Sequence, residues 1–237
     1  SINNKIKGIS SFYNQHPLIF KNHTLFISFH KVGASNSGLL FSSNFDRKAS
    51  LENSQVHNLL GKLIAEGQYN NQPIFELLHK GSTLFVSFKG DIVFFSENKM
   101  LVEDAIRASV AEDKLLVNPE FNTAYKTISK SADINLYYNY NSLIEYSNIF
   151  TSKALSTTDF SEWVATDLSL KDKLIIANGF GAFNKPTINF TDVLNNQSAE
   201  PIGITAIIPE NTSLLFSIGF DNAKQLYDQK NKILQQQ

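Results

Sequence analysis

Pairs of apolar runs separated by only three to seven residues constrain this chain more than any other feature of its sequence. One pair flanks Gly90-Asp91, a glycine-first dipeptide that suits a tight hairpin turn. Runs joined so closely pair as antiparallel neighbours, because a parallel crossover needs a dozen or more residues. The predicted strand pairs are 24–30 with 38–44, 83–88 with 92–95, and 163–170 with 174–183.

A capping residue followed by apolar residues three and four positions apart predicts a helix in five places. One predicted helix begins at Pro119, directly after the capping residue Asn118. Three others cover about 99–108, 142–150 and the residues that follow 221. The remaining one follows Ser50, ends at Gly67 and carries one apolar stripe, formed by Val56, Leu59, Leu60, Leu63 and Ile64.

Predicted strands at 134–138 and 213–218 each run directly into a helix, as the strand at 92–95 does. The segments 92–106, 134–146 and 214–227 therefore share one plan of strand, polar cap and helix. We interpret this likeness as a strand–helix duplication inside one domain. The predicted fold class is α+β, with antiparallel sheets built from hairpins and amphipathic helices packed on one face.

The chain of 237 residues is predicted to be a single α+β domain, 1–237. Two lobes, about 1–150 and 160–237, are the alternative, with the loosest stretch at 151–161 between them. The sequence opens at Ser1 without a methionine and closes on three glutamines. We therefore expect a piece of a longer protein, with a removed N-terminal signal or anchor and a last helix that continues in the parent protein.

The composition favours a place outside the cytoplasm. The chain has no cysteine, which removes thiol chemistry, disulfides and cysteine-based metal sites. Charged residues make up 18%, well below the usual quarter, and the net charge of −1 gives no field that attracts nucleic acid. No stretch approaches the roughly eighteen apolar residues that span a bilayer. The predicted location is extracytoplasmic, in the periplasm or at the outer membrane.

No motif predicts a catalytic, metal or cofactor site. The five histidines have no ligand spacing, and no Gly-x-Ser-x-Gly elbow is present. Asn178-Gly-Phe-Gly181 lacks the third glycine and the following helix of a phosphate-binding loop. Asp167 has no acidic partner two residues away on its predicted strand. A carboxylate pair would have to come from Asp167 with Asp133 or Glu162.

Aromatic residues are the remaining resource for binding. Four tyrosines gather around one predicted strand–helix junction, and they could line a groove for a sugar or a peptide: Tyr137, Tyr138, Tyr140 and Tyr146. The alternative is that they are amphipathic rings at the edge of a core. These four residues are the predicted binding site, and the sequence predicts no catalytic residue.

Several stretches resemble large envelope-anchored bacterial proteins of unknown function. The resemblance lies in Leu25–Gly33 (LFISFHKVG), in Met100–Arg107 followed by Asn118–Phe121, in Trp163–Leu170 and in Ile176–Phe180. It implies a secreted or lipid-anchored parent protein with further domains. It brings no catalytic residue to this sequence.

The sequence therefore leaves the function unknown. The first hypothesis is a non-catalytic extracytoplasmic module that presents a strand edge or an aromatic groove to a protein or glycan partner in the envelope. One alternative is a hydrolase that acts on envelope polymers through a carboxylate pair. Another is a lipid-binding carrier.

Overall fold

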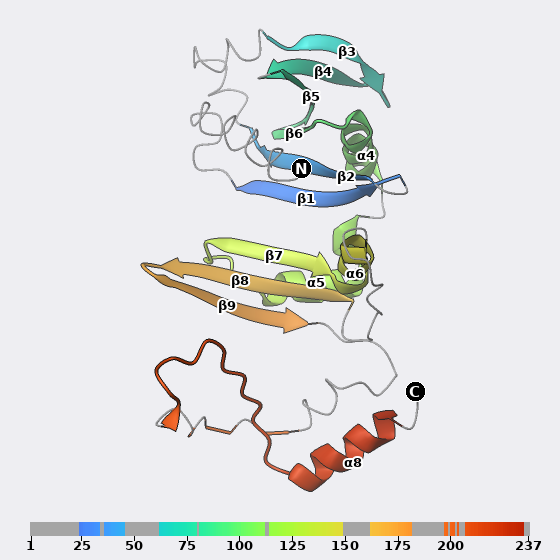
Figure 1. The fold of residues 1–237 in the computed structure, drawn as a ribbon. Coiled ribbons are helices and arrows are strands. Elements are labelled where there is room, and N and C mark those ends of the chain that lie inside the picture. The colour runs from blue at the N-terminus through green and yellow to red at the C-terminus, as the bar shows by residue number, and fades with distance from the viewer. Residues whose placement is uncertain are drawn as a thin grey trace. The chain divides into compact units, whose positions relative to one another are not determined.

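The computed structural model describes residues 24–33, 36–45, 62–79, 81–111, 114–148, 162–181, 197–198, 200–201, 203 and 207–234. The chain divides into two compact units, Ser1–Lys114 and Leu115–Gln237, here called unit 1 and unit 2. Each has its own antiparallel sheet (Figure 1). The α+β class with hairpin-built sheets is therefore confirmed.

Unit 1 holds a six-stranded sheet with the order β1-β2-β6-β5-β4-β3 and one helix. Its strands and helix are β1 (Leu25–Val32), β2 (Asn36–Asn44), β3 (Ile64–Tyr69), β4 (Gln72–His79), β5 (Ser82–Lys89), β6 (Ile92–Ser96) and α4 (Lys99–Val110). All neighbouring strands are antiparallel. The predicted hairpin turn between β5 and β6 is present, and Gly90 there has a φ of 58°, which glycine adopts without strain.

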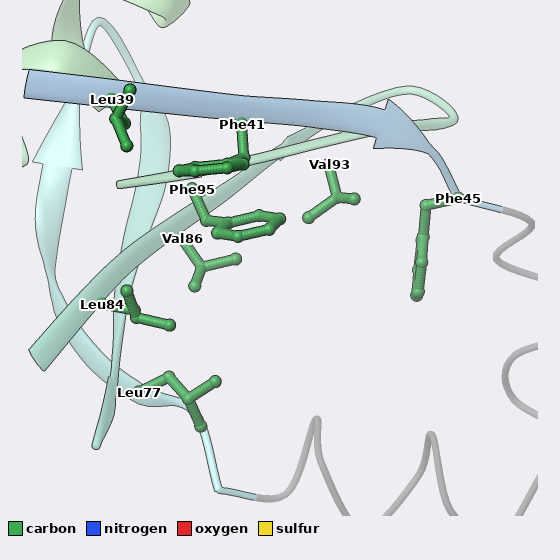
Figure 2. Packing of buried hydrophobic residues seen from close by; sticks show 8 residues of the cluster. All are labelled: Leu39, Phe41, Phe45, Leu77, Leu84, Val86, Val93 and Phe95. Carbon is green, nitrogen blue, oxygen red and sulfur yellow. The ribbon is translucent and has the colours of Figure 1, made fainter. Parts of the chain in front are cut away.

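One face of this sheet buries a cluster of eight apolar side chains (Figure 2): Leu39, Phe41, Phe45, Leu77, Leu84, Val86, Val93 and Phe95. At its centre, the rings of Phe41 and Phe95 stack with centroids 5.3 Å apart. These two residues are direct partners across the β2–β6 pair. Cross-strand aromatic pairs of this kind stabilise a sheet and fix its register.

Helix α4 packs on the opposite face of the same sheet, where Val102 and Ile106 contact Ile74 and Phe94. The side chain of Asn98 caps the helix by accepting a hydrogen bond from the backbone N–H of Met100. A Cβ at Gly38 would lie 2.6 Å from Cδ1 of Leu101, so glycine lets α4 approach β2 closely. The sheet is therefore buried on both faces at its centre.

Unit 2 holds a three-stranded sheet with the order β7-β8-β9. Its elements are η1 (Leu115–Val117), α5 (Pro119–Thr127), β7 (Ile134–Asn139), α6 (Tyr140–Asn148), β8 (Trp163–Lys171), β9 (Leu174–Gly181) and α8 (Ala223–Leu234). Helix α5 covers one face of the sheet, where Ala124 and Ile128 are buried against Ala165. Among the described helices, none is long and apolar enough to cross a membrane.

Asparagine side chains cap the helix of all three segments that the sequence marked as repeats. Asn98 caps α4, Asn139 accepts from Ser142 N–H in α6, and Asn222 accepts from Gln225 N–H in α8. Strands precede α4 and α6, as predicted. Residues 213–218 are not a strand, so that prediction is wrong for the third segment. A strand forms only where a partner supplies hydrogen bonds, and no described segment pairs with these residues.

The predicted helix that ends at Gly67 is wrong at its C-terminal end. Ile64 and Gly67 lie in β3, which pairs with β4 through a turn at Asn70 and Asn71, with φ of 47° and 60°. Asparagine tolerates this left-handed conformation, which the favoured hairpin turn requires at both positions. Strand pairing overrides the helical spacing here. The remainder of that helix, up to residue 61, and the segment 151–161 lie outside the described residues.

The pH dependence of unit 1 tests the packing of His30, which lies on β1. Burial lowers the pKa of His30, and the charge of Asp104 opposes this shift. The unfolded chain then binds a proton that the folded chain does not, so stability should fall as the pH drops below the ordinary value of 6.5. Urea unfolding followed by circular dichroism should show this loss in the parent chain and a smaller one in His30→Gln. An equal loss in both would contradict the assignment.

Candidate functional site

The structure places the four predicted tyrosines on two elements. Tyr137 is half-buried on β7 and faces α5, whereas Tyr138 points to the other face of the sheet, because neighbouring strand residues alternate. Tyr140 begins α6, and its N–H donates to the carbonyl of Glu162 at 2.8 Å. Tyr146 lies on α6, but its side chain is outside the described part. Tyr137 and Tyr138 therefore do not share one groove.

Tyr137 belongs instead to an aromatic cluster between α5 and the sheet. Its ring centroid lies 5.6 Å from that of Phe121 and 5.8 Å from that of Tyr125. Phe121 also packs edge-on against Trp163 at 4.9 Å. Burial raises the pKa of Tyr137, and the nearby Tyr125 and Asp167 raise it further. This arrangement is that of rings at the margin of a core.

The sequence offered a signal for this cluster. Phe121 and Tyr125 are four residues apart on the predicted helix and therefore share one face. Tyr125 is partly exposed, and Nζ of Lys130 lies 6.0 Å from its ring centroid, within reach of a cation–π contact. The contact between Phe121 and Trp163 depends on where strand β8 lies beside β7, which the local sequence does not reveal.

Two of the acidic residues considered for a carboxylate pair, Asp167 and Asp133, hold neighbouring segments in place. Asp167 accepts hydrogen bonds from the N–H of Ser129 at 2.9 Å and from Nδ2 of Asn135 at 2.8 Å. Asp133 accepts from the N–H of Leu170 at 2.8 Å. These bonds fasten the turn between α5 and β7 to strand β8. Among the described residues, no three histidine, aspartate or glutamate side chains gather as a metal-binding group.

The outer strand β9 presents a different kind of surface. Among the described strands it pairs only with β8, so its outer side forms one edge of the sheet. Residues 174–181 contain no charged residue and no proline, and they expose four large apolar side chains: Leu174, Ile175, Ile176 and Phe180. We call these eight residues the β9 edge. Natural edge strands usually carry charge, proline or a bulge, because an unprotected edge attracts an added strand.

The edge strand β1 of unit 1 also exposes apolar side chains, namely Phe26, Ile27 and Phe29. It differs from β9 because it carries Lys31 and the titratable His30. A lysine on an edge strand is a common protection against added strands. The β9 edge is therefore the less protected of the two.

A second exposed apolar stretch follows in unit 2. Residues 213–220, here called the C-terminal extended segment, expose 86% of Leu214 and 81% of Phe216. Leu215, Ile218 and Phe220 are exposed as well. The segment leads into the capped helix α8, and hydrogen bonds from Ser198 lower the pKa of Asp221 at this junction. This segment has the composition of a strand but, within the described residues, no strand beside it.

Comparison with known proteins gives a family but no activity. A family model described as "Protein of unknown function (DUF3352)" matches residues 45–237, which is more than half of the chain. No curated protein and no solved structure gives a significant match.

Proposed function

We propose that this chain, which belongs to the DUF3352 family of proteins of unknown function, is a non-catalytic binding module of the cell envelope. It works outside the cytoplasm, in the periplasm or at the outer membrane, and holds a protein partner along the β9 edge. The single observation that carries the proposal is the exposed, uncharged and apolar β9 edge at the end of the three-stranded sheet.

Strand addition is the binding mode that such an edge favours. The partner contributes an extended segment, and main-chain hydrogen bonds along β9 supply much of the affinity. Alternate side chains then supply specificity, because every second residue faces the same side of the sheet. Ile176 and Phe180 lie on the face that α5 covers, and Ile175 lies on the other.

The composition supports the proposed location. The chain has no cysteine, so it carries no thiol that an oxidising compartment would modify, and its polar residues are largely uncharged. The resemblance to envelope-anchored proteins agrees with this location. An anchor or further domains in the parent protein would hold the module at the membrane while β9 stays accessible.

Cysteine labelling in the native cell tests both location and binding. The parent chain has no cysteine, so Lys173→Cys in the exposed turn and Ala177→Cys on β9 are the only reactive thiols in their variants. In intact cells, a membrane-impermeant maleimide should label Lys173→Cys readily. It should label Ala177→Cys about tenfold more slowly, because the partner covers β9, whereas both should react alike in urea.

Two results would contradict the proposal. Labelling of Lys173→Cys only after the cells are broken would place the protein in the cytosol. Equal labelling of the two positions in intact cells would mean that nothing covers β9. Circular dichroism of the purified variants checks that each one folds before the rates are compared.

A further inference from the structure

We infer that the strand which docks on the β9 edge is the C-terminal extended segment of a second copy of this chain. The inference rests on the proposed function, since it names the partner of the same edge. Each copy then offers one accepting strand and one donated strand. Two copies satisfy both by reciprocal exchange, which closes the assembly as a dimer with twofold symmetry.

The two segments are alike in composition. β9 spans 174–181, and the extended segment, as defined above, spans 213–220. Neither contains a charge or a proline. Together they expose nine large apolar side chains, four on β9 and five on the segment. Among the described strands, none pairs with the outer side of β9 or with the segment. The backbone of Glu200 lies beside Gly219, near the C-terminal end of the segment, so residues 213–218 are the part on which the strand exchange depends most.

Charge favours an antiparallel arrangement. If Leu174 lies opposite Phe220, then Lys173 lies opposite Asp221, and unlike charges close one end of the strand pair. A parallel arrangement of the same eight residues would place Lys173 opposite the neutral Thr212. The two strands are therefore antiparallel in the proposed dimer.

Side-chain size supports this register on the face away from α5. Ile175 lies opposite Gly219, Ala177 opposite Ser217, and Gly179 opposite Leu215, so no two large residues compete for one position. On the α5 face the same register aligns four of the segment's five exposed large apolar residues with Leu174, Ile176, Asn178 and Phe180: Phe220, Ile218, Phe216 and Leu214. A continuous apolar surface results there.

Disulfide trapping tests the partner and the register together. One full-length chain carries Ala177→Cys and another carries Ser217→Cys, and the two are mixed under mild oxidation. Opposite residues of an antiparallel pair have Cβ atoms about 4.5–5.5 Å apart, close enough for a disulfide after a small adjustment. We expect a mixed disulfide dimer in high yield. The matched control is Ser213→Cys with Ala177→Cys, four residues and about 13 Å out of register, which should give at least tenfold less.

Solution mass gives an independent measurement. Sedimentation equilibrium should find the parent chain as a dimer at micromolar concentration. Phe216→Lys should weaken the dimer at least tenfold, because it places a charge in the apolar face. Since Phe216 is exposed in the single chain, this variant should still fold. A parent chain that stays monomeric, or a chain with both cysteines that forms the disulfide within itself, would overturn the second-copy assignment.

A synthetic peptide of residues 210–222 separates this failure from failure of the proposed function. Suppose that the parent chain is monomeric, that the fluorescent peptide binds it, and that a peptide of scrambled sequence does not compete. Then β9 accepts strands, and only the second-copy assignment is wrong. If the chain is monomeric and the peptide does not bind, the second-copy assignment is wrong. Equal labelling of Lys173→Cys and Ala177→Cys in intact cells would then show that the strand-addition function is wrong as well. Dimerisation with the expected disulfide supports both.

Discussion

Phe41→Ala should lower the free energy of unfolding of unit 1 by about 3–5 kcal/mol. Phe41 is only 1% exposed, and its ring stacks on Phe95 at the centre of the sheet (Figure 2). Truncation removes the buried ring and leaves a cavity that the neighbouring β-strands cannot close without shifting. Such a loss is a large part of the total stability of a small unit.

Urea unfolding followed by far-ultraviolet circular dichroism measures this loss. The matched control is Phe26→Ala, the same substitution on the adjacent strand β1, where the ring is 57% exposed. This control should change the unfolding free energy by no more than about 0.5 kcal/mol. Similar losses in the two variants would show that the cluster is not the core of unit 1.

Phe121→Ala should lower the stability of unit 2 by a similar amount, about 3–5 kcal/mol. Phe121 is buried and touches three other rings, those of Tyr125, Tyr137 and Trp163. Its loss weakens the packing of α5 on the sheet, which Ala124 and Ile128 then hold alone. Contacts between ring edges and faces add to the loss beyond the buried area itself.

The single tryptophan of the chain makes this prediction specific to unit 2. Trp163 lies against Phe121, so its fluorescence reports on this cluster alone. Phe121→Ala should move the fluorescence transition to lower urea, whereas Phe41→Ala should move only the circular dichroism transition. Leu143→Ala, a half-exposed position on α6, is the control for unit 2. A fluorescence transition that shifts equally in Phe41→Ala and Phe121→Ala would mean that the units unfold together.

Local turn chemistry explains which parts of the fold were predictable. The hairpins around Gly90 and around 172–173 follow from short polar connections between apolar runs, and both are confirmed. The β3–β4 hairpin was missed because its turn, Asn70-Asn71, lacks the usual glycine. Helix-like spacing up to Ile64 also favoured the wrong element. The cap at Asn118, by contrast, located the start of α5, and α4 and α8 begin within two residues of their predicted starts.

The candidate site was less predictable, for a physical reason. Apolar residues on both faces, as in Leu174-Ile-Ile-Ala177, are typical of a central strand that is buried on both sides. Only the strand order reveals that β9 lies at an edge. In the same way, the hydrogen bond between Asn135 and Asp167 depends on the β7–β8 register. The contact between Tyr137 and Phe121 depends on how α5 packs on the sheet.

The turn before β9 gives this strand its nearest charges. Lys171, Asp172 and Lys173 stand at one end, and the next eight residues are uncharged. Charges in such positions act as gatekeepers that oppose fibril growth from apolar strands. Their repulsion between stacked chains is screened as salt rises, since the Debye length shortens from about 30 Å at 0.01 M to about 3 Å at 1 M. Concentrated solutions of this protein should therefore aggregate most slowly at low ionic strength, and their turbidity should rise as salt is added.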